Sequence, residues 1–293
     1  GKQVVHHKKQ STGGPSSKRP RNADFDEGRF KSKENQDRFD QRYLPKKIIP
    51  EKRIEWKGLP VSSPILEVIN MRRWHKLVNF AKPSSSSILK EFLANVNQET
   101  VEESRRSWVR GVKVPFDSEF IEDFPRTSYE SIYYCRRMQP IPGTGRAHYR
   151  DDMPQLADEI RQGVTGLYSS WRMRVGSDII PEKLKRQDLH GEVDFWHQFV
   201  NHSIIPSTNN SDVNTERVTL LYVLMRDLHL DIASVLSDRM LRMIKDTNSR
   251  SFLSHSSLIS HLCMHAGLEI PDDEPKDVPI SSLMTHRTYL DSE

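Results

Sequence analysis

The most constraining feature of the sequence is an almost wholly apolar run, VTLLYVLM, at positions 218–225. Thr215 or Asn214 can cap a helix before the run, and Glu216 places an acid in its first turn. A helix that is apolar on all sides is stable only when other elements surround it. The run therefore predicts a buried central helix, and we expect the hydrophobic core there.

Other segments repeat apolar residues every three or four positions, which is the spacing of an amphipathic helix. One begins after Ser63 and Pro64 and extends to about Phe80, and another follows the serines at 84–87. Short connections after residue 214 predict that the last three helices pack antiparallel as neighbours. The remaining expected helices lie at 153–167, 194–200, 232–244 and 258–266.

The stretch 108–116, WVRGVKVPF, alternates around Gly111 and predicts a short β-hairpin. Asp117 is placed to cap a short helix through Phe124, and two prolines with two glycines in 139–152 predict a long loop. The predicted fold class is mainly α, an irregular multi-helix bundle with one short hairpin near 108–116 and disordered termini.

Charge and core-forming residues are distributed unevenly. Residues 1–58 hold 16 of the 44 Lys and Arg residues but 8 of the 40 Asp and Glu residues. Residues 1–40 contain too few apolar side chains to offset an entropy cost of about 1–2 kcal/mol per ordered residue. We predict a disordered basic arm over 1–58, a helical domain over 59–270 with sub-lobes 59–138 and 153–270, and a disordered tail over 271–293.

Cysteine content and hydropathy exclude several classes of protein. Cys135 and Cys263 alone cannot build a disulfide framework or a four-thiolate zinc site, and they fit a reducing compartment. No stretch approaches the roughly 18 consecutive apolar residues of a membrane span. We therefore expect no membrane partner. Gly143 to Arg146 lacks the Gly-Lys-Ser/Thr end of a phosphate-binding loop, and we expect no cofactor.

Several segments follow one another in the order typical of a plant family. They are FDEGRF, ENQDRFDQRYLPKKIIPEKRIEW, ILKEFLANV, WVRGVKVPFDSEFIEDF, FWHQFVNHSIIPSTNNSDVNTERVTLLYVLM and SFLSHSSLISHLCMHAGL. Together they resemble the "putative plant transposon protein" domain family over about residues 25–270. The resemblance implies descent from a plant transposable element and supplies no catalytic residues. The sequence departs from the family at FPRTSYESIYYCRRMQPIPGTG, which replaces a short leucine-rich continuation.

Enzymes of transposable elements have recognisable motifs. The Asp-Thr/Ser-Gly motif of aspartic proteases is absent from the sequence, and the single Tyr-x-Asp-Asp string, at 149–152, stands in the segment predicted to be a long loop. A transposase triad could be drawn from Asp151, Asp152, Glu192 and Asp194, but its core needs alternating strands that the pattern does not predict. We predict no catalytic residues, with a remnant metal-dependent transposase or integrase as the enzyme alternative.

Two clusters contain residue types that bind metals. His261 and His265 are four positions apart on an expected helix, a spacing that two metal-binding histidines can use. Solvent-facing histidines beside a buried Cys263 thiol explain the same pattern, and we favour that interpretation. The second cluster consists of His190, Glu192, Asp194 and His197. Charged flanks of a helix explain it, so we predict no metal site.

The basic arm carries the clearest functional signal. Two basic clusters, separated by a polar spacer, resemble a nuclear import signal or a nucleic-acid-binding tail. They consist of Lys8, Lys9, Lys18, Arg19 and Arg21. We predict a non-enzymatic, loosely gag-like interaction or assembly protein that is nuclear or nucleocytoplasmic. Its expected partners are an import receptor, nucleic acid bound non-specifically, and further copies of itself. The alternatives are a simple solubility tail and a partner-binding scaffold with no nucleic-acid role.

Overall fold

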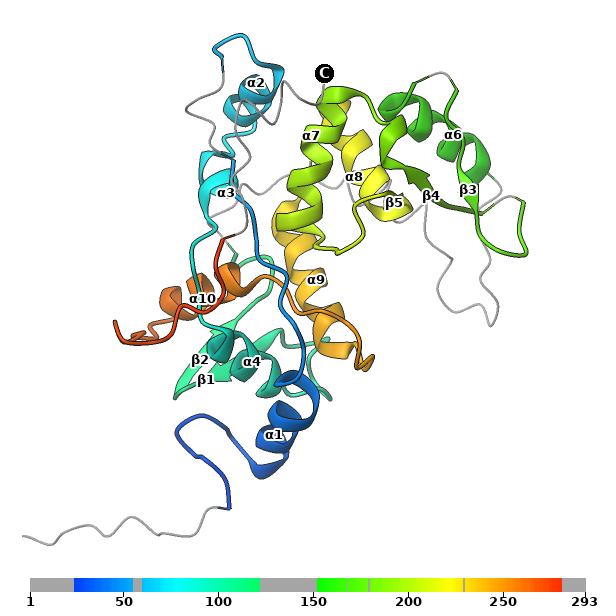
Figure 1. The fold of residues 1–293 in the computed structure, drawn as a ribbon. Coiled ribbons are helices and arrows are strands. Elements are labelled where there is room, and N and C mark those ends of the chain that lie inside the picture. Colours follow the sequence, from blue (N-terminus) through cyan, green and yellow to red (C-terminus); the bar gives the residue numbers. More distant parts are fainter. Residues whose placement is uncertain are drawn as a thin grey trace, which may run out of the picture.

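The computed structural model describes residues 24–54, 60–121, 152–166, 168–178, 180–228 and 230–280. The described chain is mainly helical, as predicted, and also contains two small antiparallel sheets (Figure 1). The α-helices are α1 (Lys33–Arg38), α2 (Pro64–Met71), α3 (His75–Asn79), α4 (Ser86–Ala94), α6 (Met153–Val164), α7 (Gly191–Phe199), α8 (Thr215–Met225), α9 (Ile232–Lys245) and α10 (Ser256–His265). Shorter helical turns are η1 (Phe39–Tyr43), η3 (Arg186–Asp188) and η4 (Val200–Ile204). The strands are β1 (Arg106–Val109), β2 (Val112–Pro115), β3 (Arg172–Met173), β4 (Pro181–Lys185) and β5 (Asp212–Asn214).

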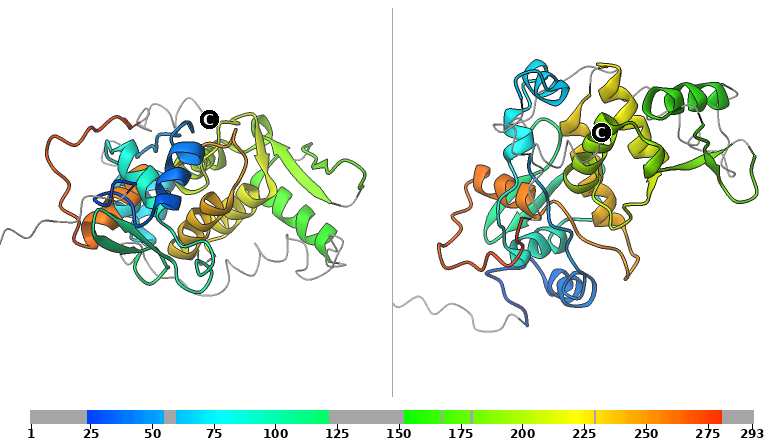
Figure 2. Two further views of the ribbon diagram at one scale, coloured as in Figure 1. Left: turned by 90° about the horizontal axis from the view of Figure 1, so that it is seen from below. Right: turned by 45° about the horizontal axis from the view of Figure 1, so that its top comes forward.

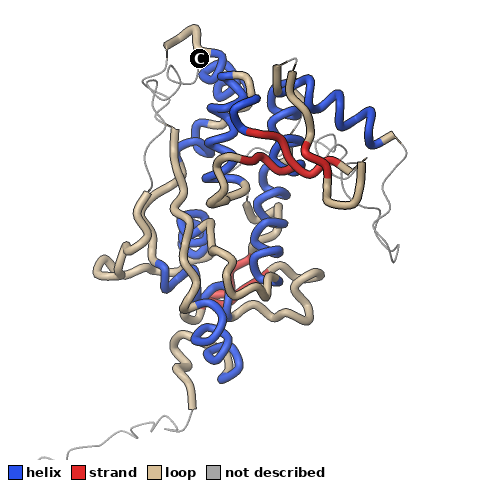
Figure 3. Tube along the Cα trace, turned by 45° about the vertical axis from the view of Figure 1, so that its right-hand side comes forward, coloured by secondary structure: helices blue, strands red, loops and turns tan. Residues whose placement is uncertain are grey.

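The predicted hairpin is confirmed, and a second sheet was not foreseen. Strand β1 pairs with β2 through a turn at Arg110 and Gly111, whose φ angles of 47° and 91° are both left-handed. The second sheet has the order β3-β4-β5, and Figure 3 shows the strands in two separate places among the helices. Strands β3 and β5 have only two and three residues, which is too short for a period to be recognised.

The elements form two groups with α9 between them. Helix α4, the β1–β2 hairpin, α1 and α10 lie at one end, whereas α6, α7, α8 and the second sheet lie at the other (Figures 1 and 2). The predicted neighbour packing of the last three helices is wrong, because α8 packs mainly against α6, α7 and β4, and α10 packs against α4 and β2. Helix α10, which was expected in the sub-lobe 153–270, therefore packs against elements of the sub-lobe 59–138. The buried side chains of the two sub-lobes form one cluster.

Helix α8 is the buried central helix that the apolar run predicts. Residues 217–224 are all buried, and the side chain of Asn214 caps the helix by accepting from the N–H of Arg217 at 3.1 Å. Helix α6 approaches closely at Gly163, where a Cβ would lie 2.6 Å from the ring of Tyr222. The missing side chain of Gly163 thus sets the distance between α6 and α8.

The helix predicted from Pro64 to about Phe80 is divided into α2 and α3. Arg73 has a left-handed φ of 55° between them, so the chain changes direction. The turn places Trp74 in the core, with its ring centroid 6.1 Å from that of Trp196 in an edge-to-face contact. Burial of a large indole against another aromatic ring stabilises this arrangement over a continuous, partly exposed helix.

The segment after the hairpin is a turn as far as the structure describes it. The carboxylate of Asp117 accepts a hydrogen bond from the N–H of Phe120 at 2.9 Å, so it caps a turn and not the expected helix. Most of the loop predicted at 139–152 lies outside the described residues.

The prediction of a disordered arm over 1–58 is wrong for residues 24–54, which pack against the domain. Phe30 and Phe39 contact edge-to-face at 5.2 Å, and Tyr43 is fully buried. Arg38 donates to the carbonyls of Ala94 and Val96 at the end of α4, each at 2.9 Å. In the same way, Arg42 donates to the carbonyls of Ile244 and Asp246 at the end of α9, at 2.6 and 2.7 Å.

These arginine contacts explain the error in the arm prediction. The last carbonyls of a helix lack intrahelical partners, and guanidinium groups can satisfy several of them at once. Arginines that looked like a solvated charge run therefore serve as caps for two helices. The few aromatic side chains of residues 24–54 are enough to hold the segment in place, because they pack into the core formed by the rest of the domain.

The predicted disordered tail over 271–293 is wrong for residues 271–280. Ser84 and Val278 exchange two backbone hydrogen bonds of 3.0 Å, and Val278 is buried. The carboxylate of Asp277 accepts from the N–H of Ser86 at the start of α4, at 2.8 Å. Acids at a helix N-terminus are favourable, and this contact helps to hold the segment.

A buried carboxylate, that of Glu91 on α4, joins four parts of the chain. It accepts from Arg29 Nε at 2.8 Å, from Ser87 at 2.9 Å, and from Arg110 Nε and Nη2 at 3.1 Å each. Arg110 also donates to Glu274 at 2.7 Å, which connects the C-terminal segment. Glu91 is fully buried, so its charge depends on these partners for its stability.

We expect Glu91→Gln to lower the free energy of unfolding by about 3 kcal/mol, because it leaves two guanidinium groups without their shared anion. Urea unfolding followed by circular dichroism measures this change. The matched control is Asp37→Asn, which removes an exposed pair with Lys33 on α1 and is expected to leave the midpoint unchanged. Equal midpoints for the Glu91 variant and the wild type would contradict the assigned role.

Candidate functional site

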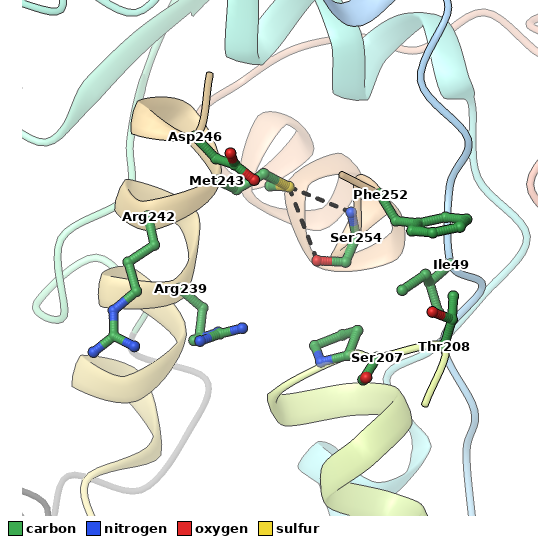
Figure 4. A pocket seen from close by; sticks show the side chains of 10 residues that line it. Ile49, Ser207, Thr208, Arg239, Arg242, Met243, Asp246, Phe252 and Ser254 are labelled. Atoms are coloured by element: carbon green, nitrogen blue, oxygen red, sulfur yellow. Dashed lines mark hydrogen bonds between the residues drawn. The ribbon is translucent and has the colours of Figure 1, made fainter. Parts of the chain in front are cut away.

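A polar pocket lies where four segments from both groups of elements meet (Figure 4). Its walls come from α9, the loop after η4, the loop before α10 and the extended chain near Ile49, and its volume is about 390 Å³. The lining side chains are Ile49, Pro206, Ser207, Thr208, Arg239, Arg242, Met243, Asp246, Phe252 and Ser254. Pockets between structural units are common sites of ligand binding.

Two arginines one turn apart on α9 give the pocket its positive charge. The carboxylate of Glu216 on α8 accepts from Arg239 at 3.1 Å and from Arg242 at 2.9 Å, so one anion is shared by two cations. Figure 4 shows Arg239 extending from α9 toward the side where Ser207 lies. Burial lowers the pKa of Arg239, with Glu216 acting in the opposite direction.

A third arginine, Arg217, is close enough to Arg239 for their charges to repel each other. Its Nε donates to the carbonyl of Ile205 at 3.0 Å, and burial lowers its pKa to about 10. At the rim, burial opposes the ionisation of Asp246, but hydrogen bonds from the N–H of Asn248 and from Ser251, together with nearby cations, lower the pKa of Asp246 overall. Three arginines thus lie near two carboxylates.

The opposite wall contains a serine and a histidine in contact. Ser254 Oγ lies 2.8 Å from His255 Nδ1, and His255 Nε2 lies 3.3 Å from the carbonyl of Ile204. A neutral ring with its proton on Nε2 satisfies both contacts, since Ser254 then donates to Nδ1. Burial, and secondarily Arg239, lowers the pKa of His255 to about 4. A buried base this weak is poorly matched to general-base catalysis near neutral pH.

The arrangement can bind a small anion. Guanidinium groups and the hydroxyls of Ser207 and Thr208 are all donors to phosphate or carboxylate oxygens. The sequence patterns did not indicate this pocket, because its arginines are ordinary polar positions on the amphipathic helix α9. Only the neighbouring loops turn them into a site.

The predicted arm residues Lys8, Lys9, Lys18, Arg19 and Arg21 lie outside the described residues. Of the acids considered for a transposase, Asp151 also lies outside them. Asp152 precedes the first residue of α6, a helix of 12 residues and about 18 Å. The start of α7 lies at the opposite end of α6, because the N–H of His190 donates to the carbonyl of Val164, the last residue of α6. Asp194 forms a bidentate pair with Arg186 at 2.5 and 2.7 Å. The described acids of this set therefore do not converge.

The first histidine cluster has the expected arrangement, whereas His197 of the second is buried and does not lie on a charged flank of the helix. His261 and His265 are exposed, with their rings stacked at 6.4 Å, and Cys263 faces the core, where burial raises its pKa to about 12. His197 is buried on α7, and its Nδ1 lies 3.9 Å from Asp194. Within the described ranges, no group of three or more His, Cys, Asp or Glu side chains could hold a metal ion.

The described residues thus form a mainly helical protein with two small antiparallel sheets. The model of the family described as "Putative plant retrotransposon-related domain" matches residues 70–269, and the chain belongs to this family. The match confirms the plant transposon-related resemblance drawn from the sequence. No curated protein and no solved structure gives a significant match. None of the described helices has the length and apolar character needed to cross a bilayer.

Three histidines around the pocket and α7 make stability depend on pH. Burial lowers the pKa of His197, His202 and His255 to about 4 each, below the value of 6.5 in an unfolded chain. The unfolded state therefore binds more protons between pH 4 and 6.5, and stability is lost as the pH falls through this window. Burial raises the pKa of Glu51 to about 7, which acts in the opposite direction between pH 4.5 and 7.

Because three histidines oppose one carboxyl group, we expect the free energy of unfolding to fall from pH 6.5 to 4.5. His197→Leu should reduce the slope by about 1.4 kcal/mol per pH unit in this window, since one fewer proton is taken up on unfolding. Urea titrations at several pH values measure the slope. His261→Leu, at an exposed position, serves as the control, and an unchanged slope for the His197 variant would contradict the expectation.

Proposed function

We propose that this protein is a non-enzymatic, retrotransposon-derived nucleic-acid-binding protein, gag-like in the loose sense, in which a helical domain carries a basic N-terminal arm. One observation carries the proposal. Residues 1–22 contain six Lys and Arg residues and no Asp or Glu, whereas Arg38 and Arg42 of the following segment cap helices. The basic residues of 1–22 thus form a run of uniform charge next to a segment whose arginines stabilise the fold.

Such an arm binds through phosphate contacts. Each Lys or Arg that neutralises a phosphate releases counterions, so affinity falls steeply with salt and depends little on sequence. Dissociation constants of about 10⁻⁴ to 10⁻⁶ M at physiological salt are typical of this mode. The same clusters, with Lys18, Arg19 and Arg21 around Pro20, fit the short basic motifs that import receptors bind.

The described domain supports a binding role over a catalytic one. Its most buried carboxylates serve the fold: Glu91 neutralises Arg29 and Arg110, and Glu51 accepts from the backbone at the start of α10. Asp194 is paired with Arg186, and those acids of the transposase set that the structure describes do not meet. The arginine pocket adds donors suited to a phosphate group, which is consistent with a nucleic-acid partner.

Replacing Lys8, Lys9, Lys18, Arg19 and Arg21 by Gln should weaken binding to single-stranded RNA. If all five contact phosphates, the slope of log K against log salt should decrease in magnitude by about 3.5. Fluorescence anisotropy with a labelled oligonucleotide measures the slope. The salt concentration is varied over about 50–200 mM, the range in which the affinity of phosphate contacts falls steeply. Lys113→Gln with Lys185→Gln, both exposed on strands, is the matched control. Identical slopes for the arm variant and the wild type would contradict the proposal that the arm binds RNA phosphates.

The import role has a separate test. Deleting residues 1–22 from a fusion large enough to be excluded from passive entry should lower the nuclear fraction measured by microscopy in plant cells. Lys18→Ala, Arg19→Ala and Arg21→Ala together should reproduce the loss, because they remove the second cluster alone. Nuclear accumulation that is the same with and without the arm would contradict this role and leave RNA binding as its only proposed use.

A further inference from the structure

A second and larger cavity lies on the other side of α10, separate from the arginine pocket. It has a volume of about 830 Å³ and is bounded by α3, the extended chain at 80–85, α10 and the C-terminal segment 270–276. We call it the α10 groove. Its size falls within the range of sites that enclose small molecules or short peptide segments.

The walls of the α10 groove are held in place by hydrogen bonds. The N–H of Lys82 donates to Ser257 Oγ at 2.7 Å, and Ser84 Oγ donates to Ser256 Oγ at 2.9 Å. On the other wall, Glu274 binds Ser85 at 2.7 Å and Arg110 at 2.7 Å. The groove is therefore preformed, and a ligand would not have to order it.

The floor of the groove is apolar and adaptable. Phe80, Ile88, Met264 and Ile270 contribute to it, and Met264 is 49% exposed although it lies on a helix with a buried face. Methionine side chains adapt to varied partners, which suits a site that receives an apolar side chain. Ser260, which is 7% exposed, has no hydrogen-bond partner for its hydroxyl within the described residues, and it also lines the groove. An unsatisfied buried hydroxyl is costly, and a ligand carbonyl could accept from it.

The rim of the groove is basic. Lys76, Lys82 and Lys276 line it, as do His75 and His261. The two acids at the rim are Asp272 and Glu274, and the hydrogen bond from Arg110, with further contacts, lowers the pKa of Glu274, so its charge is already matched. Lys82 and Lys276, both exposed, present positive charge at this rim.

We propose that the α10 groove binds a short acidic peptide segment of a partner protein. An apolar side chain of the peptide lies against Phe80 and Met264, its carboxylates approach Lys82 and Lys276, and a peptide carbonyl accepts from Ser260. The largely aliphatic floor favours a peptide over nucleic acid, because bases bind by stacking on aromatic rings and Phe80 is the one aromatic ring other than imidazole among the lining residues. This site is independent of the basic arm and of the proposed binding of nucleic acid.

The test uses the full chain and a fluorescein-labelled peptide of alternating Glu and Leu, eight residues long, in anisotropy titrations. Two comparison peptides replace either every Glu by Lys or every Leu by Ser. We expect the Glu-Leu peptide to bind at least about tenfold more tightly than both, because the groove combines an apolar floor with a basic rim. Equal binding of the Glu-Leu and Glu-Ser peptides would overturn the proposal, since attraction by the basic arm alone predicts that result.

Variants of the groove locate the binding site. Lys82→Glu with Lys276→Glu, and separately Met264→Asp, should each weaken the Glu-Leu peptide at least about tenfold. Lys185→Glu, a charge reversal on β4, is the matched control and should have little effect. Circular dichroism and the unfolding midpoint show that each variant is folded. Unchanged affinity for the Glu-Leu peptide in both groove variants would overturn the proposal. It would also be overturned if an oligouridine displaced the peptide and the same variants abolished binding of that oligouridine.

Discussion

The carboxylate of Glu91 is the constraint on which the rest of the structure depends. A fully buried charge is tolerated only with well-placed partners, and those of Glu91 come from distant parts of the sequence. Arg29 belongs to the N-terminal segment, Arg110 to the turn of the hairpin, and Glu274 extends the network to the C-terminal segment. One buried anion thereby fixes the position of both ends of the described chain against α4.

Charged side chains also satisfy backbone groups at the ends of helices. Arg38 and Arg42 satisfy carbonyls at the ends of α4 and α9, and Glu51 accepts from the backbone at the start of α10. These groups complete helix ends that would otherwise be buried without partners. The folded domain thus uses the charges of Arg38 and Arg42 for its own stability.

Helix α10 has a central place because two different surfaces meet on it. Its start lies beside the arginine pocket through Ser254 and His255, while Ser260 and Met264 line the α10 groove. Its buried face packs against α4, so both surfaces depend on the contact between these two helices. One helix and the loop before it thereby border both candidate cavities.

Local signals in the sequence determined the helices, because caps and apolar spacing act within a few residues. Asn214 and Ser85 cap the helices expected after them, and the apolar run at 218–225 forms the central helix. Tertiary structure alone decided that Trp74 breaks a helix, that α10 pairs with α4, and that Arg42 caps α9, about 200 positions away. Both candidate cavities also depend on such long-range contacts, since each is lined by segments whose proximity no local pattern encodes.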